Sequence, residues 1–149
     1  MRKGGTVVAS WQYDTEGIDW DALCRLYQAA PLGNKTAAQL ETAYANSMFA
    51  CFVFDDGILV GAGRAVADGV DVSYIGDVAL LPSHQGIGLG TQIVQWLVDR
   101  SRGHKKIIMY AVPGKEGFYK RFGFKRMNTA MAMFENQAGA LERGYLNDA

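Results

Sequence analysis

Three glycines at alternating positions carry the strongest chemical signal in this chain. Gly86, Gly88 and Gly90 follow a strand-like run and precede a segment with the apolar spacing of an amphipathic helix. The first N–H groups of a helix have no partner within it, and the helix dipole favours negative charge at that end. Because glycine has no side chain, an anion can approach this backbone closely. The spacing predicts a diphosphate cradle; the alternative is simply a tight strand-to-helix turn.

Two common nucleotide-binding motifs do not fit these glycines. A Walker loop requires Gly-Lys-Ser/Thr at the helix start, where this chain has Gly90-Thr91-Gln92. A dinucleotide-binding fingerprint requires GxGxxG and an acidic residue at the end of the following strand. The spacing here differs, and residues 109–112, which end the following strand, include no carboxylate. Both classes of nucleotide-binding protein are therefore disfavoured.

The candidate residues must be positioned by a predicted series of helices and strands. Leu23, Leu26 and Tyr27 recur at helical spacing after Asp19, the expected N-cap. Short apolar runs separated by turn residues then predict three antiparallel strands, which excludes a purely parallel, doubly wound sheet. The expected helices are 19–30, 36–46, 89–100 and 116–121, and the expected strands are 6–9, 49–54, 58–60, 71–81, 105–112 and 124–134, the last of these a strand or strand pair. No linker or repeat divides the chain, so residues 1–149 are expected to form a single domain.

Three segments, in this order along the chain, resemble motifs of one enzyme superfamily. The run Gln85-Gly86-Ile87-Gly88-Leu89-Gly90 resembles the Q/R-x-x-G-x-G/A pyrophosphate loop of the GNAT superfamily of acyl-CoA N-acyltransferases. Residues 74–82 resemble the fourth strand of that family, and 118–124, FYKRFGF, resemble its FYxxxGF element. The resemblance implies an α/β (α+β) fold with a mixed, mostly antiparallel sheet of about six to seven strands. About four helices flank that sheet, and strands 4 and 5 splay apart.

The resemblance also implies an activity and a set of cofactor-binding residues. The activity is transfer of an acetyl group from acetyl-CoA to a primary amine, and the expected acceptor is a small molecule. The backbone of the fourth strand would bind the pantetheine arm, and a backbone N–H there, from Val78, would face the thioester oxygen. The implied cofactor-binding residues are Val78, Ala79 and Leu80 for pantetheine, and Gln85, Gly86, Ile87, Gly88, Leu89, Gly90 and Thr91 for the diphosphate.

Tyr119 is the expected general acid. It occupies the tyrosine position of the FYxxxGF element. The ordinary tyrosine pKa of about 10 lies above the thiol pKa of about 8.5, so the phenol stays protonated at neutral pH and can donate to a departing thiolate. The alternative is an aromatic side chain that only packs beside Phe118 and Phe122.

The general base is less clearly marked. Many relatives have Glu where this chain has Gly76, and Asp77 is the next residue. Alternation along a strand directs Gly76 and Asp77 to opposite faces, so Asp77 takes the catalytic role only if a β-bulge redirects it. Its alternative roles are to cap neighbouring backbone or to pair with a basic residue on the adjacent strand. His84 is a second candidate, expected to be solvated near the phosphates. Glu116 and Glu135 are further candidates.

Four residues are expected to line the acceptor pocket between the first two helices and the splayed strands. They are Tyr27, Leu32, Tyr44 and Phe49. Aromatic rings there would hold an apolar amine or contact a protonated one through cation–π interaction, although ordinary core packing is the alternative for each. Glu41 is the acidic residue of this region. A small monoamine or amino acid derivative therefore fits better than a polyamine.

Composition narrows the range of partners. The chain has 15 Lys plus Arg and 15 Asp plus Glu, a formal net charge of zero, which argues against nucleic acid or a membrane surface as partner. Cys24 and Cys51 are not in metal-binding or disulfide spacing, so no metal is expected. These thiols and the lack of a signal-peptide pattern predict a cytoplasmic protein.

Three further questions stay open on the sequence. A protein of this kind could bind acyl-CoA as a sensor without turnover, because Gly76 stands at the usual base position. It could instead acetylate a protein N-terminus or lysine, given a wide groove. The apolar residues of 127–134 could form an edge strand that pairs with a second chain in a homodimer, or a strand that is buried within one subunit.

Overall fold

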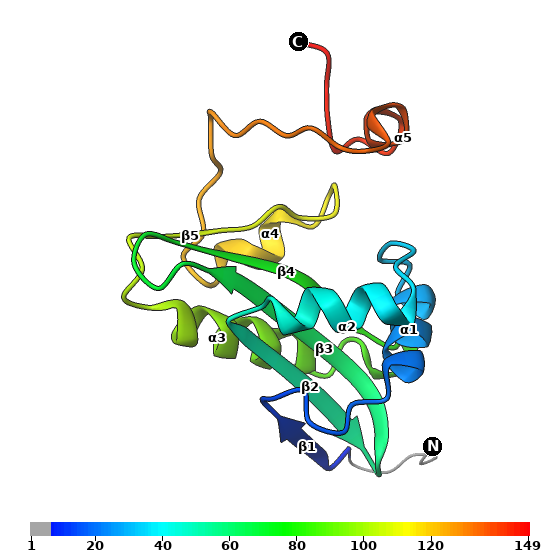
Figure 1. Ribbon diagram of the computed structural model, residues 1–149. Helices are drawn as coiled ribbons and strands as arrows, with labels where there is room; N and C mark the ends of the chain where they lie inside the picture. The colour runs from blue at the N-terminus through cyan, green and yellow to red at the C-terminus, as the bar shows by residue number, and fades with distance from the viewer. Residues whose placement is uncertain (1–6) are drawn as a thin grey trace. The chain divides into compact units, whose positions relative to one another are not determined.

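The computed structural model describes residues 7–149 and contains one mixed sheet with helices on both of its faces (Figure 1). The sheet has five strands in the order β1-β2-β3-β4-β5. The strands β1 to β4 pair antiparallel, and β5 joins β4 in parallel. The strands are β1 Ala9–Gln12, β2 Phe49–Asp55, β3 Ile58–Ala67, β4 Val72–Leu80 and β5 Lys106–Ile108. The predicted fold class, mixed and mostly antiparallel, is confirmed.

The four predicted helices, α1 to α4, lie close to their predicted positions, and the described residues also form a 3-10 turn and a further short helix. These elements are α1 Trp20–Ala29, α2 Ala37–Ala45, the 3-10 turn η1 Pro82–His84, α3 Leu89–Ser101, α4 Glu116–Lys120 and α5 Gln137–Glu142. Asp19 is the N-cap of α1, as predicted, and its side chain accepts from the N–H groups of Asp21 and Ala22. At α2, Thr36 and Gln39 form a reciprocal capping box. None of the described helices has the length and apolar character that crossing a bilayer would require.

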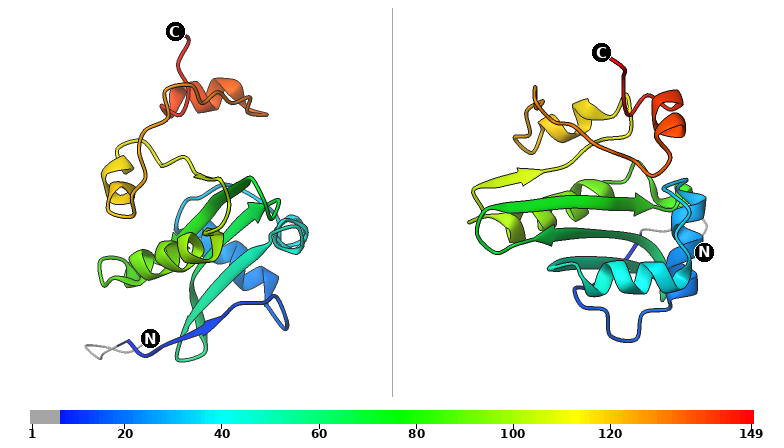
Figure 2. Two further views of the ribbon diagram at one scale, coloured as in Figure 1. Left: turned by 90° about the vertical axis from the view of Figure 1, so that its left-hand side faces the viewer. Right: turned by 45° about the horizontal axis from the view of Figure 1, so that its top comes forward.

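The core has a layer on each face of the sheet. The helices α1 and α2 lie over one face of the sheet (Figure 2). Their leucines and tyrosines pack on Phe52, Ala62 and neighbouring strand residues. On the opposite face, α3 approaches β3 so closely that a Cβ on Gly63 would lie 2.8 Å from Ile93 and 3.0 Å from Leu97. Glycine in β3 therefore allows the long helix to sit directly on the sheet.

The chain forms two compact units, one ending at Met109 and one comprising Tyr110–Ala149. The second contains α4, α5 and a cluster of rings. Within this cluster Tyr110 is 6.0 Å from Phe134 and 5.8 Å from Tyr145, ring centre to ring centre. The Asn136 side chain accepts from the Gly139 N–H and starts α5, a helix that the sequence reading did not anticipate.

Several expectations about strands are wrong. The sheet has five strands among the described residues, not six to seven. The first strand was expected over 6–9, but it begins at Ala9, and Thr6 lies outside the described residues. Residues 124–134 form neither a strand nor a strand pair: no partner strand is recorded for them, and Met131 and Met133 are 96% and 94% exposed. The expected edge strand for dimer formation is therefore not present in the described chain.

Candidate active site

A β-bulge interrupts β4 at Asp77. In the pairing of β3 with β4, Ala62 faces Ala79 and Arg64 faces Gly76, so Asp77 and Val78 together oppose Gly63. The φ of Asp77 is +53°, in the left-handed region that Asp adopts more readily than most residues. The extra residue changes the alternation of side chains, which is the condition on which a functional role of Asp77 depended.

The bulge directs the Asp77 carboxylate toward Arg64 of β3. Arg64 Nε donates to Asp77 Oδ2 at 2.8 Å, and Lys35 Nζ lies 3.7 Å from the same oxygen. Arg64 also donates to Ser47 Oγ at 3.3 Å and lies 5.9 Å from the ring centre of Tyr44. The Asp77 side chain therefore lies on the same face of the sheet as Gly76, the face that α1 and α2 cover. It pairs there with a basic residue of the adjacent strand.

Tyr27 and Tyr44 meet beneath this carboxylate. The two side chains are 4% and 2% exposed, and their hydroxyls lie 2.5 Å apart. The Tyr27 hydroxyl also donates to the backbone carbonyl of Asp77 at 2.6 Å. Desolvation is the largest cause that raises the pKa of each phenol well above its ordinary value. Both hydroxyls are thus occupied by protein groups and stay protonated.

The four residues expected to line an acceptor pocket are not all brought together. Leu32 packs against the core that contains Tyr27 and Tyr44. Phe49 lies on the opposite face of the sheet, where its ring is 5.4 Å from the Arg100 guanidinium and 6.3 Å from the His104 ring. Phe49 instead borders a cavity of about 320 Å³ with Tyr13, Met48, Trp96 and Arg100.

The strands β4 and β5 separate after a short parallel ladder. The ladder pairs Val72 with Lys106 and ends where Tyr74 meets Ile108. In the described chain, the recorded partner strand of the rest of β4, from Ile75 to Leu80, is β3 alone. This divergence is the predicted splay of strands 4 and 5, and Val78, Ala79 and Leu80 lie along its β4 side.

The glycine-rich loop follows β4 through η1 and leads into α3. Gly86 and Gly88 have φ of +79° and +92°, and a Cβ on either would meet no atom within 4 Å. Gly88 is the N-cap of α3 and has no side chain that could cap the helix. Its carbonyl accepts a hydrogen bond from the Gln92 N–H at 3.1 Å. Gly90 differs, because its Cβ would contact Leu80 at 3.4 Å. Two of the three glycines thus leave open space over the helix start.

The remaining predicted loop residues have distinct environments. Gln85 donates through its side chain to the Leu80 carbonyl at 3.3 Å. Ile87 is exposed, and Leu89 is buried under the first turn of α3. Thr91 lies in that same first turn. The ten cofactor-binding candidates therefore lie on two nearby segments, at the end of β4 and from the loop into the first turn of α3, with Leu81 and η1 between them.

His84 is not solvated, which corrects that expectation. It is 4% exposed, its Nε2 lies 2.9 Å from Asp55 Oδ2, and its Nδ1 lies 2.8 Å from Ser83 Oγ. These contacts tie η1 to the end of β2 beneath the loop. His84 therefore has a structural role in holding the loop.

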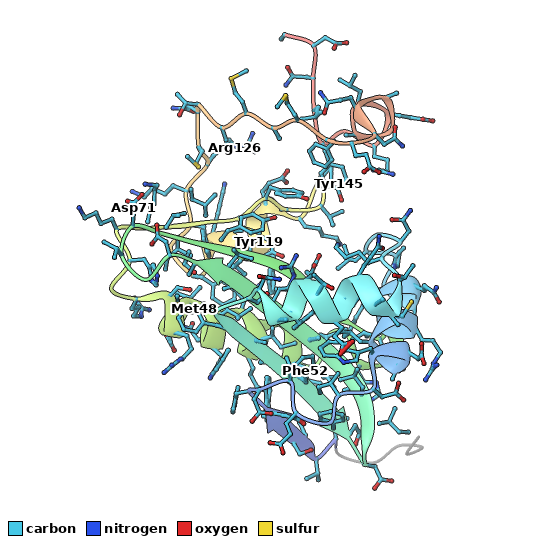
Figure 3. The ribbon with its side chains drawn as sticks, in the orientation of Figure 1. Met48, Phe52, Asp71, Tyr119, Arg126 and Tyr145 are labelled. Atoms are coloured by element: carbon cyan, nitrogen blue, oxygen red, sulfur yellow. The ribbon has the colours of Figure 1, made fainter. Side chains whose placement is uncertain are left out.

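Tyr119 lies on α4 in the second unit (Figure 3). Its ring is 5.0 Å from the Phe118 ring and 6.3 Å from the Phe124 ring, both perpendicular to it. Desolvation raises its pKa above the ordinary value, so the phenol stays protonated at neutral pH. Glu116 accepts from the Gly114 N–H, and backbone hydrogen bonds lower the pKa of its carboxyl. A lowered pKa makes Glu116 a poor proton acceptor.

Sequence reasoning allowed a basic partner for Asp77 on the adjacent strand but did not identify Arg64 or Lys35. Arg64 is a single charged residue within the apolar run of β3, and that isolation was the available signal. Lys35 lies in the loop before α2 and carried no comparable signal. Within residues 7–149, His, Cys, Asp and Glu side chains form no group of three that could hold a metal ion.

Taken together, the splayed sheet, the bulge and the glycine loop define the class of protein. The chain belongs to the Acetyltransferase (GNAT) family, whose model matches residues 18–124. Similar solved structures include a probable acetyltransferase from meticillin-resistant Staphylococcus aureus, 25% identical, with a TM-score of 0.75 over 85% of this chain and 98% of that one.

Two plant proteins are among its relatives. Serotonin N-acetyltransferase 2, chloroplastic, of Oryza sativa subsp. japonica is 33% identical over 72% of this chain. GCN5-related N-acetyltransferase 1, chloroplastic, of Arabidopsis thaliana is 31% identical over 74% of this chain. The alignments cover 57% and 58% of those proteins, so the chain spans little more than half the length of either relative.

Proposed function

We propose that this protein is an acetyl-CoA-dependent N-acetyltransferase that acts on a primary amine of a small molecule. The observation that carries the proposal is the arrangement along one stretch of chain, residues 77–88. It contains a bulge with a redirected carboxylate, a splayed strand edge and two left-handed glycines at an uncapped helix start. Family membership supplies the chemistry that these three features serve.

Each feature has a role in the proposed reaction. The backbone of Val78, Ala79 and Leu80 holds the pantetheine arm, and the N–H groups of residues 85–91 hold the diphosphate. The amine nitrogen attacks the thioester carbonyl carbon, and the Val78 N–H stabilises the negative oxygen that forms. The carbon–sulfur bond then breaks, Tyr119 gives its proton to the thiolate, and the nitrogen of the new amide loses a proton through water, which restores the phenol.

Asp77 assists removal of the proton from the acceptor amine. An alkylamine has a lysine-like pKa of about 10.4 and is protonated at pH 7, so its proton must leave before attack. The Asp77 carboxylate orients the ammonium group or a water molecule that takes this proton. Its neighbours Arg64 and Lys35 are cations, which leaves no surplus negative charge for a polyamine. A monoamine or an amino acid derivative is the acceptor class that we propose.

The proposed activity is tested by acceptor-dependent release of CoA thiol. The purified chain is incubated with acetyl-CoA and with serotonin, tyramine, glucosamine 6-phosphate, an amino acid amide, spermidine or a lysine peptide. We expect thiol release with at least one small monoamine. Tight binding of CoA without acceptor-dependent release would favour the sensor function, and preference for the peptide would favour a protein acetyltransferase.

Tyr119→Phe tests the general acid. The change removes the hydroxyl and keeps the ring that packs between Phe118 and Phe124. We expect kcat to fall about 10²-fold or more, the usual scale for a positioned acid, with little change in acetyl-CoA affinity. Tyr13→Phe, an exposed tyrosine that stacks on Trp96 of α3, is the matched control. An unchanged kcat in Tyr119→Phe would contradict the assignment.

A further inference from the structure

A chain of hydrogen bonds ends on the backbone of the bulge. The Tyr44 and Tyr27 hydroxyls lie 2.5 Å apart, and the Tyr27 hydroxyl lies 2.6 Å from the Asp77 carbonyl oxygen. A carbonyl oxygen can only accept, so Tyr27 donates its one proton to Asp77 and accepts a hydrogen bond from Tyr44. The order of donors is therefore fixed, from Tyr44 to Tyr27 and from Tyr27 to the bulge.

The accepting carbonyl belongs to the peptide unit that joins Asp77 to Val78. No cis peptide bond occurs among residues 7–149, and the C=O and N–H of a trans unit point in opposite directions. When Tyr27 holds the Asp77 carbonyl, it therefore also holds the Val78 N–H, directed away from Tyr27. A left-handed residue in a strand needs such support, because the regular ladder alone does not favour it.

We propose that Tyr27, supported by Tyr44, is a positioning residue that fixes the direction of the Val78 N–H. The catalytic consequence rests on the proposed function, in which this N–H faces the thioester oxygen. The hydrogen bonds that fix the direction of the N–H do not depend on that function. A backbone donor that is already aimed needs no reorganisation as charge develops on the oxygen. Tyr27 does not touch the reacting atoms in this scheme and acts through the peptide unit.

Burial keeps both phenols in the donating state. Tyr27 and Tyr44 are enclosed by the α1 and α2 core, and their raised pKa values exclude ionisation at neutral pH. A role in core packing alone would need the rings and not the hydroxyls. Phenylalanine at position 27 would then serve as well as tyrosine, whereas positioning requires the hydroxyl.

Tyr27→Phe separates these two roles in the kinetics. We expect kcat to fall about tenfold, equivalent to about 1.4 kcal/mol, while KM for acetyl-CoA stays within about twofold. Tyr44→Phe should lower kcat in the same direction by less, because Tyr27 keeps its bond to Asp77. Tyr13→Phe is again the matched control and should behave as the wild type.

Backbone NMR of the protein without ligand gives a readout independent of turnover. Tyr27→Phe should shift the Val78 amide resonance more than the amide resonances of α3. An unmoved Val78 amide, or an unchanged kcat in an active enzyme, overturns the inference. If the wild-type chain acetylates none of the amines, the proposed function fails and the Val78 amide alone decides the inference. If Tyr27→Phe does not fold, the same two measurements are made on Tyr44→Phe. An unchanged kcat together with an unmoved Val78 amide resonance in that variant would overturn the inference.

Discussion

Two places along the β4 region adopt the left-handed backbone, and they are held in opposite ways. At the bulge the residue is Asp77, and its carbonyl and carboxylate are held by Tyr27 and Arg64 from other elements. In the loop the residues are Gly86 and Gly88, around which a Cβ would meet nothing within 4 Å. Tertiary contacts thus maintain the first conformation, and the residue type alone permits the second.

The difference shows how a site can combine two kinds of preorganisation. A left-handed conformation costs a residue with a side chain about 1–2 kcal/mol, which the contacts of Asp77 must offset. Glycine adopts the same region at little cost and leaves the space above it open. The bulge should therefore be sensitive to changes in its partners, and the loop to any added side chain.

Of these two regions, the bulge is the one where the larger effect is expected. Asp77→Asn removes the charge but keeps a side chain that tolerates the left-handed region. We expect kcat to fall about 10²-fold, because no carboxylate then assists removal of the proton from the acceptor amine. The thermal midpoint should also fall, because Arg64 loses its ion pair. Asp71→Asn is the control, since Asp71, labelled in Figure 3, forms an exposed pair with Lys106. Wild-type kcat in Asp77→Asn would show that the bulge carries no catalytic charge.

An intermediate effect is expected in the loop. Gly88→Ala adds a Cβ at a φ of +92°, in the space assigned to the diphosphate. We expect KM for acetyl-CoA to rise about tenfold with kcat nearly unchanged, a loss of about 1.4 kcal/mol of binding. Gly17→Ala is a matched control, because Gly17 has a φ of +68° and open surroundings but lies before α1. It should lower stability without raising KM. Equal changes of KM in both variants would contradict a diphosphate site.

The last effect is absent at neutral pH and appears only as a loss of stability at alkaline pH. Burial raises the pKa values of Tyr27 and Tyr44 in the folded state, whereas unfolded tyrosines ionise near pH 10. Their contribution is complete below about pH 10, and above it the unfolded chain loses protons that the folded chain keeps, so stability falls. Urea unfolding above about pH 10 should show a steeper loss in the wild type than in the Tyr27→Phe/Tyr44→Phe double variant, by up to about 1.4 kcal/mol per pH unit per tyrosine. Equal slopes would indicate that the pair is accessible to solvent.

The same contrast explains which parts could be predicted from the sequence. The glycine loop, the Asp19 cap and the β2–β3 hairpin depend on residues close together in the chain, and each was predicted near its observed position. The sequence indicated only that a catalytic role of Asp77 would require a bulge, and it did not predict the bulge itself. The residues that support the bulge lie 13 residues away at Arg64 and 50 residues away at Tyr27. No local pattern encodes such contacts.

The errors near the C-terminus have a related cause. Residues 124–134 were predicted to form a strand because they are rich in methionine and aromatics, but a strand also needs a partner strand. The segment contains Lys125, Arg126 and Asn128, and it lies outside the sheet. The helix α5 was missed because its six residues are too short for a periodic pattern.

Under the proposed function, the uncapped start of α3 would link ligand occupancy to folding. The N-cap residue Gly88 supplies no side-chain acceptor to the first turn, so a bound diphosphate would complete that end of the helix. A ligand that binds only the folded state raises the free energy of unfolding by RT ln(1 + [L]/Kd), about 2.7 kcal/mol at one hundred times Kd. In a cell with abundant cofactor, the persistence of the folded enzyme would then follow the cofactor concentration. The amount of the protein in the cell would then change slowly with the supply of acetyl-CoA.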